Sequence, residues 1–166
     1  MAKTALKGNT VETNGEMPKV NSQLPNFELV AKDLSRKTLA DYKGQNLILS
    51  IFPSIDTSTC ATSVRTFNQK AAELGETKVL CISRDLPFAQ NRFCGAEGIE
   101  NVETLSDFAT GKFGDDYGLT LQDSGLKNLH ARAIVVANKE GEIIHTELVE
   151  DIVNEPNYDA ALNALK

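Results

Sequence analysis

The sequence contains no hydrophobic run long enough to cross a membrane and no cluster of lysine and arginine residues. A transmembrane helix would need about 20 consecutive apolar residues. Acidic residues number 23 and basic residues 17, so the net charge is −6. Binding to nucleic acid or to an anionic membrane is therefore not expected. The first thirty residues also contain no apolar core typical of a secretory signal, so we expect a cytoplasmic protein.

Cysteine is scarce, with three in the chain: Cys60, Cys81 and Cys94. An odd number at wide spacing argues against a secreted scaffold held by disulfides. No two cysteines lie close enough in sequence to form the pairs typical of structural zinc sites. We therefore expect no metal and no cofactor. In a reducing compartment, a useful cysteine is more often a reagent than a cross-link.

The composition fits a globular protein, with 41% apolar residues among 166. This length suits a single domain spanning residues 1–166, and no linker or internal repeat divides the chain. Hydrophobic periodicity and turn residues predict strands and helices along the chain. The expected strands are 4–7, 10–13, 27–30, 47–52, 79–82, 102–105, 132–137 and 143–148. The expected helices are 58–74, 87–94, a short helix within 107–119, and 158–165.

The order of these segments predicts an α/β fold with a mixed central sheet. Early strand–helix–strand units favour parallel strands, and the late hairpin at 132–148 adds antiparallel ones. Helices are expected to flank both faces, and residues 4–13 are expected to form an N-terminal β-hairpin. Gly75 is expected to end the first long helix, and Gly95 the second.

Cys60 holds the most informative position, because it follows a buried strand and a short turn and lies at the start of a predicted helix. Helix N-termini carry partial positive charge, which favours a thiolate over a thiol. Cys60 also shares an inward helical face with Val64 and Phe67. Position alone leaves two readings open, a nucleophile or an inert core cysteine.

The residues around Cys60 resemble the peroxiredoxin superfamily, whose active-site pattern is Pro-x-x-x-Thr/Ser-x-x-Cys. Here the pattern reads Pro53, Thr57, Cys60. More narrowly, the chain resembles the bacterial thiol peroxidases, which are atypical two-cysteine peroxiredoxins. The similarity extends essentially from end to end. The stretches that carry it are 52–57, 60–65, 67–69 and 81–98.

This resemblance implies a thioredoxin-like fold and a homodimer. It implies that Cys60 is the peroxidatic cysteine, that Cys94 is the resolving cysteine, and that Arg132 belongs to the active site. The implied activity is reduction of hydrogen peroxide and alkyl hydroperoxides in antioxidant defence. The implied cycle passes through a Cys60 sulfenic acid and a Cys60–Cys94 disulfide, which thioredoxin reduces.

The chemistry assigns a role to each of these residues. Arg132 offers a permanently charged fork of donors, although a surface ion pair is the commoner fate of arginine. Thr57 offers a hydroxyl that could donate to peroxide or simply cap the helix. The backbone N–H of Cys60 is expected to be free at the helix start. Pro53 is rigid, has no donor, and could shield the sulfur from water.

Other polar and apolar residues receive plainer interpretations. Cys81, in a strand between apolar neighbours, is expected to be a core residue. His130 and His145 belong to no motif and are expected to be structural or solvated, and Asp115-Asp116 is expected to be a solvated turn. Phe88 and Phe93 are expected near the mouth of the site, where they would suit alkyl hydroperoxides.

A second class of function is possible in principle. The same two cysteines could serve a non-enzymatic redox-sensing binding protein whose disulfide changes its shape for a partner. Pro53, Thr57 and Arg132 would be superfluous in such a switch, so the sequence favours the enzyme. In either case, a disulfide requires Cα atoms within about 7 Å. We therefore expect the helix around Cys60 or the end of the 87–94 helix to unwind.

Overall fold

The computed structural model describes all residues from 1 to 166. Its strands are β1 (Lys3–Leu6), β2 (Asn9–Glu12), β3 (Glu28–Ala31), β4 (Arg36–Thr38), β5 (Asn46–Ile51), β6 (Thr77–Ser83), β7 (Glu103–Ser106), β8 (Ala133–Ala137) and β9 (Ile143–Leu148). Its helices are α1 (Ser58–Ala71), α2 (Pro87–Glu97), α3 (Lys112–Asp116) and α4 (Tyr158–Asn163), with a short 3-10 helix, η1 (Leu39–Tyr42).

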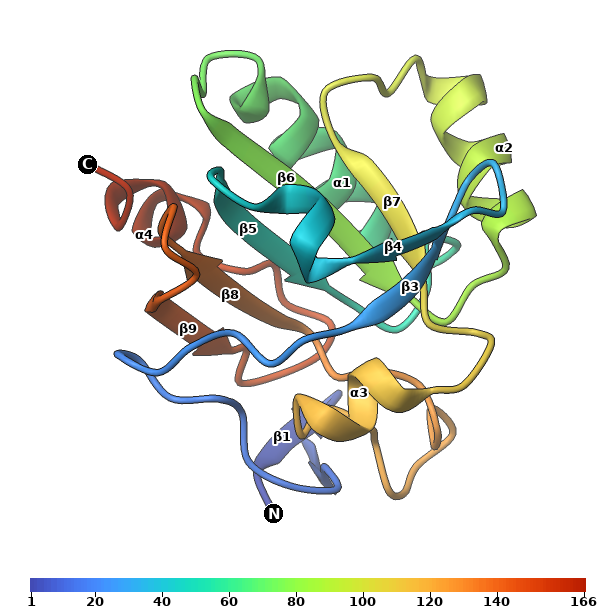
Figure 1. The fold of residues 1–166 in the computed structure, drawn as a ribbon. Coiled ribbons are helices and arrows are strands. Elements are labelled where there is room, and N and C mark those ends of the chain that lie inside the picture. Colours follow the sequence, from blue (N-terminus) through green and yellow to red (C-terminus); the bar gives the residue numbers. More distant parts are fainter.

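The predicted mixed sheet is confirmed. Seven strands form it in the order β4-β3-β7-β6-β5-β8-β9 (Figure 1). Strands β5, β6 and β7 run parallel to one another, because α1 and α2 provide the crossovers between them. The remaining pairs are antiparallel, including the predicted β8–β9 hairpin.

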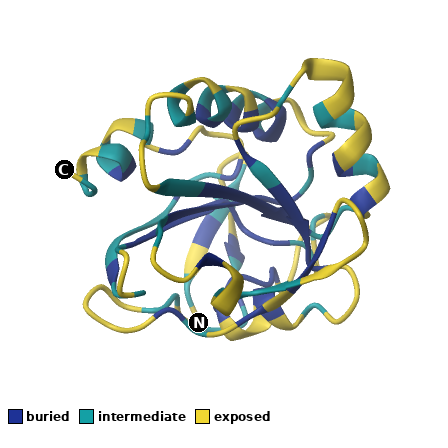
Figure 2. Ribbon diagram, turned by 45° about the horizontal axis from the view of Figure 1, so that its top comes forward, coloured by how far each residue is buried: buried dark blue, intermediate teal, exposed yellow.

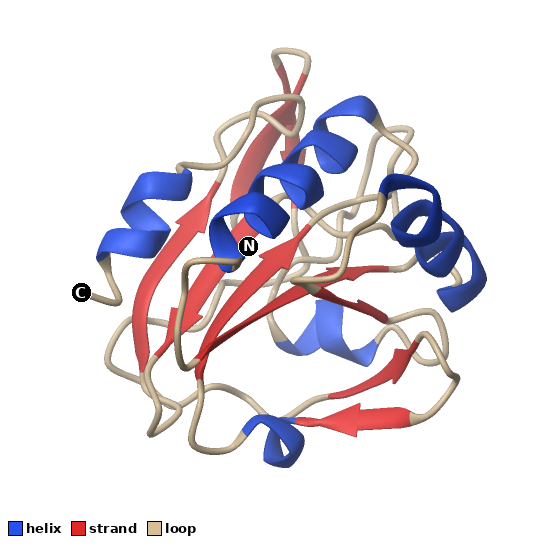
Figure 3. Ribbon diagram, turned by 90° about the horizontal axis from the view of Figure 1, so that it is seen from above, coloured by secondary structure: helices blue, strands red, loops and turns tan.

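The sheet separates two apolar cores, because the side chains of each strand alternate between its faces. In β5, Ile48 packs on the face covered by α1, whereas Leu47 and Leu49 pack on the opposite face. Helices α1, α2 and α4 lie on one side of the sheet, and α3 and η1 lie on the other (Figure 3). The central strands are buried along most of their length, as Figure 2 shows.

The N-terminal hairpin is also confirmed. Strands β1 and β2 pair with each other and form a separate two-stranded sheet. The turn between them is Lys7-Gly8, and both residues have positive φ angles, 51° and 84°. Val11 of β2 anchors the hairpin in the core on the α3 side.

The structure corrects the predicted end of the second long helix. Helix α2 continues through Gly95 and ends at Glu97. Gly98 caps it, because Gly98 adopts the left-handed conformation with φ 66° and donates its N–H to the carbonyl of Cys94. Either Gly95 or Gly98 could end this helix, and it ends before Gly98 because that glycine adopts the left-handed conformation of a helix cap.

Other boundaries also differ from the prediction. Helix α1 ends at Ala71, one turn before Gly75, and α4 ends at Asn163. Strand β4 and helix η1 were not predicted. Asp115 and Asp116 are exposed, as predicted, but they form the end of α3 instead of a turn, and Asp115 accepts a hydrogen bond from the Thr120 hydroxyl at 2.7 Å.

A buried charged cluster fixes α3 beneath the sheet. The Asp107 carboxylate lies 2.9 Å from Nε2 of His130 and accepts a bond of 3.3 Å from Nε of Arg84. It also accepts hydrogen bonds from the backbone N–H groups of Phe113 and Gly114 at 3.2 and 2.9 Å. It thereby provides partners for N–H groups in the first turn of α3, which have none within the helix. His130 is therefore structural, which was one of the two readings of the sequence.

This cluster predicts that acid destabilises the fold. Burial, the largest effect, lowers the pKa of His130, although Asp107 opposes the shift. Burial acts to raise the pKa of Asp107, but its bonds to His130 and Gly114 and the charge of Arg84 together lower it. Both groups therefore bind protons more readily in the unfolded chain, so stability is present at neutral pH and is lost as pH falls.

We expect the free energy of unfolding, measured in urea, to fall as pH drops below about 6.5, the unperturbed pKa of histidine. In the variant His130→Gln, the free energy of unfolding should depend less on pH near pH 6, because the variant lacks the titrating imidazole. An unfolding free energy that stays level between pH 7 and pH 5 in the natural sequence would contradict the prediction.

Candidate active site

The site forms where β5 leaves the sheet. Phe52 donates its backbone N–H to the carbonyl of Ile82, and the buried Pro53 then turns the chain away from the sheet. Thr57 has extended backbone angles and occupies the N-cap of α1, which begins at Ser58. Cys60 thus lies in the first helical turn, as predicted, and none of its surface is exposed.

The structure corrects the expectation of a free backbone N–H at Cys60. That N–H donates to Oγ1 of Thr57 at 3.3 Å. The Thr57 hydroxyl in turn donates to the carbonyl of Ser54 at 3.1 Å. Thr57 therefore caps the helix, which was one of its two predicted roles, and its role toward a substrate stays a prediction.

Arg132 contacts the sulfur of Cys60. Its Nη2 donates to Sγ at 3.1 Å, and its Nε donates to the carbonyl of Ile152 at 2.8 Å. The side chain is only 3% exposed, so it is not the surface ion-pair residue of the alternative reading. The pairing of β5 with β8 explains the contact, because it sets Ile51 opposite Ala133 and so places Arg132 beside the end of β5.

The third nitrogen of the same guanidinium is unusual. Nη1 of Arg132 is buried and has no hydrogen-bond partner. Leaving a buried donor of a charged group unpaired costs roughly 1–3 kcal/mol or more. An acceptor oxygen that reached Nη1 would relieve this cost.

Asp85 holds the loop in front of Cys60 and was not singled out from the sequence. Its carboxylate accepts the Ser54 hydroxyl at 2.7 Å and the backbone N–H of Ile55 at 2.6 Å. It also accepts the Ser83 hydroxyl at 2.6 Å, and that hydroxyl accepts from Gln90 of α2 at 3.0 Å. The position of Asp85 just beyond the carboxyl end of β6, beside β5, could have indicated this role.

Cys94 lies apart from this group. It is half-buried on α2, and neither a disulfide nor a hydrogen bond joins it to Cys60. It lines a different hollow, together with Thr104 of β7. Burial raises the pKa of its thiol, although Thr104 and Lys32 oppose the shift. The structure thus brings Cys60 together with Thr57 and Arg132 and places the buried Pro53 at the start of the loop before α1, but it does not bring Cys94 to them.

Cys81 is a core residue, as expected. It is fully buried in β6, in the core covered by α1, and burial raises the pKa of its thiol. A thiol of raised pKa in an apolar core is a poor nucleophile.

An open groove of about 530 Å³ lies outside the site, between α1 and α2. Phe93 lines it, as expected, whereas Phe88 is 65% exposed and is not among the lining residues. Two ion pairs connect α2 to the middle of α1 and to the loop that precedes α1: Arg65 with Glu97, and Arg92 with Asp56 at 3.4 Å.

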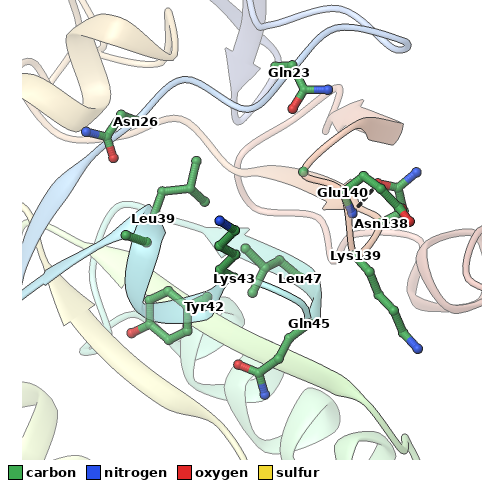
Figure 4. A pocket seen from close by; sticks show the side chains of 12 residues that line it. Gln23, Asn26, Leu39, Tyr42, Lys43, Gln45, Leu47, Asn138, Lys139 and Glu140 are labelled. Carbon is green, nitrogen blue, oxygen red and sulfur yellow. Dashed lines mark hydrogen bonds between the residues drawn. The ribbon is translucent and has the colours of Figure 1, made fainter.

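A second hollow, of about 460 Å³, lies at the opposite end of β5 (Figure 4). Tyr42 and Leu47 form part of its wall, but it contains none of the predicted site residues. No group of three or more histidine, cysteine or acidic side chains is arranged to hold a metal ion. No helix combines the length and apolar character that crossing a membrane requires.

Comparison with known proteins gives a consistent result. The family model described as Redoxin matches residues 19–162. The chain is 52% identical to a thiol peroxidase of Corynebacterium glutamicum and 53% identical to one of Mycobacterium tuberculosis, in each case over 99% of both chains. Among solved structures, a peroxiredoxin-like protein from Aquifex aeolicus matches with a TM-score of 0.93 and 37% identity, covering 98% of this chain and 95% of the other.

Proposed function

Because the chain belongs to the Redoxin family, and within it to the thiol peroxidases, we propose that it reduces hydrogen peroxide and organic hydroperoxides through Cys60. The observation that carries this proposal is the 3.1 Å contact between Nη2 of Arg132 and Sγ of Cys60 in a buried site. A positively charged donor in this position lies beside the atoms among which negative charge moves during attack on a peroxide, so it can stabilise the transition state.

In the first step, the Cys60 thiolate attacks one oxygen of the hydroperoxide and the O–O bond breaks. Sulfur loses two electrons and becomes a sulfenic acid, and the departing oxygen takes a proton and leaves as water or an alcohol. Preorganised donors aimed at the departing oxygen can contribute roughly 100-fold or more each. The unpartnered Nη1 of Arg132 is the donor best suited to this role.

Access to the sulfur needs a small movement, because Cys60 is fully buried. The loop between Pro53 and Thr57 separates it from the groove beside Phe93. The polar and apolar lining of this groove is compatible with hydrogen peroxide and with alkyl hydroperoxides. Pro53, which has no N–H donor, helps keep water from the sulfur in the closed state.

In the second step, the Cys94 sulfur attacks the sulfenic sulfur, a disulfide forms, and the hydroxyl leaves as water. Cys94 must first approach, and the packing of α2 makes this feasible. Only Pro87 and Gln90 of its eleven residues are buried. Gly95 inside the helix costs about 1 kcal/mol relative to alanine. We therefore place the unwinding in the part of α2 that follows Gln90.

The third step needs a dithiol reductant to open the disulfide, and we propose thioredoxin for this role. We further propose that residues 1–166 act as a single domain, that two copies form a homodimer, and that the protein works in antioxidant defence in the cytoplasm. The cycle needs no cofactor, because its electrons pass directly between thiols, the disulfide and the hydroperoxide.

Mass spectrometry of peroxide-treated protein tests the cycle. One equivalent of hydroperoxide should yield a Cys60–Cys94 disulfide in the natural sequence. The variant Cys94→Ser should complete one round of peroxide reduction and then stop, because it lacks the thiol that resolves the sulfenic acid. The matched variant Cys81→Ser should retain continuous turnover with thioredoxin, thioredoxin reductase and NADPH.

Two outcomes would overturn the proposal. A bridge that involves Cys81 in place of Cys94 would contradict the assignment of the resolving cysteine. A Cys60–Cys94 bridge without continuous peroxide consumption would favour the non-enzymatic redox switch instead.

A further inference from the structure

The turn of the N-terminal hairpin binds the carboxylate of Asp151, which lies near the C-terminal end of the chain. The backbone N–H groups of Lys7 and Gly8 donate to the two oxygens of Asp151 at 3.0 and 2.8 Å. Both residues have positive φ angles, so the turn presents consecutive N–H groups to the same carboxylate. Such paired amides form an anion-binding concavity. These bonds lower the pKa of Asp151, the bond from Gly8 most of all.

The body of the hairpin binds the same segment, residues 149–153. The Thr4 hydroxyl donates to the carbonyls of Val149 and Glu150 at 2.8 and 3.2 Å. Ile152 donates its N–H to the carbonyl of Ala5 at 2.8 Å. The hairpin is therefore fastened to this segment on both sides of Asp151.

The gripped segment reaches the candidate active site through two carbonyl groups. Asp151 shapes its own turn by accepting the N–H of Val153 at 3.2 Å. The carbonyl of Ile152 then accepts Nε of Arg132 at 2.8 Å, and the carbonyl of Val153 accepts the hydroxyl of Thr59 at 3.0 Å. The two residues that follow Asp151 thus hold the arginine and the residue preceding Cys60.

We propose that the N-terminal hairpin positions Arg132 for catalysis, with Asp151 as the positioning residue. This inference rests on the proposed function. The Ile152 carbonyl fixes the rotation of the guanidinium, and that rotation decides whether Nη2 faces the sulfur and Nη1 remains available. Asp151 touches neither sulfur nor substrate, so it acts only through Arg132.

The test measures the second-order rate of Cys60 oxidation by hydrogen peroxide, using quenched flow and mass spectrometry on the reduced full chain. The variant Asp151→Ala removes the acceptor of three backbone N–H groups. Because a displacement of 1 Å can cost about 100-fold, we expect partial release of the turn to slow oxidation by about 10-fold. The milder variant Thr4→Val should slow it by about 3-fold, since it removes one of the fastening points.

Asp123→Ala is the matched control. The Asp123 carboxylate also accepts an N–H from the hairpin, that of Glu12 at 3.3 Å, but its segment holds no part of the site. Its oxidation rate should stay within about twofold of the natural rate, because the loss of one exposed bond has a small effect.

A double-mutant cycle separates positioning from general destabilisation. In an Arg132→Ala background, Asp151→Ala should change the rate by less than about twofold, because the residue it acts through is already gone. Full additivity of the two substitutions, or an unchanged rate in Asp151→Ala alone, would overturn the positioning role. If the natural sequence and Arg132→Ala oxidise Cys60 equally slowly, the proposed function itself fails.

Discussion

Replacing Cys60 with serine is expected to reduce hydroperoxide consumption to the uncatalysed rate. Serine keeps the size of the side chain and can still accept a hydrogen bond from Nη2 of Arg132, which now donates to sulfur at 3.1 Å. A hydroxyl oxygen cannot take the place of sulfur in the two-electron oxidation, so no sulfenic acid can form. The loss should therefore be chemical and not structural.

The measurement is peroxide consumption with thioredoxin, thioredoxin reductase and NADPH. The control is Cys81→Ser, which makes the same replacement in β6, within the same apolar core, and should remain active. Urea unfolding of both variants would show that the fold persists. Residual turnover above about 1% in Cys60→Ser would contradict nucleophilic catalysis by this cysteine, since serine contributes nothing to the redox step.

The second large effect is expected at Arg132. Replacement with lysine should lower kcat/KM for hydroperoxide by about 100-fold or more, which corresponds to about 2.7 kcal/mol of transition-state stabilisation. The guanidinium donates to the Ile152 carbonyl and to the Cys60 sulfur at the same time, and its third nitrogen, Nη1, has no partner. A lysine ammonium is a single point charge and cannot serve these positions together.

Arg36→Lys provides the control for charge and size, because Arg36 lies exposed on the edge strand β4. Its kcat/KM should be unchanged. Equal activity of the two lysine variants would remove Arg132 from the mechanism and leave its contact with sulfur without a catalytic meaning.

Much of the fold was predictable, because long apolar runs define the central strands locally. Strand β4 escaped prediction because Arg36–Thr38 has no apolar alternation, and it exists only through its pairing with β3. The end of α2 was misplaced because Gly95 looks like a terminator, whereas Gly98 makes the left-handed cap that ends the helix.

The candidate site divides in the same way. Pro53, Thr57 and Cys60 share one turn, so their pattern is visible in the sequence. Arg132 stands 72 residues from Cys60, and only the antiparallel pairing of β5 with β8 brings the two together. Asp151 could not be chosen from among the 23 acidic residues, because its partners are backbone N–H groups of the distant N-terminal hairpin and of its own turn. Asp85, in contrast, lies just beyond the carboxyl end of β6, and that position was a signal available in the sequence.

The small number of buried residues in α2 affects how long the protein stays active in excess peroxide. If every turnover melts and rebuilds part of this helix, the sulfenic acid at Cys60 remains unresolved for the duration of the melting. A second peroxide that arrives in that interval would drive the sulfur to the sulfinic state, from which thiols cannot recover it. How many cycles one molecule survives is then governed by how fast a poorly anchored helix frays, rather than by the reactivity of the sulfur itself.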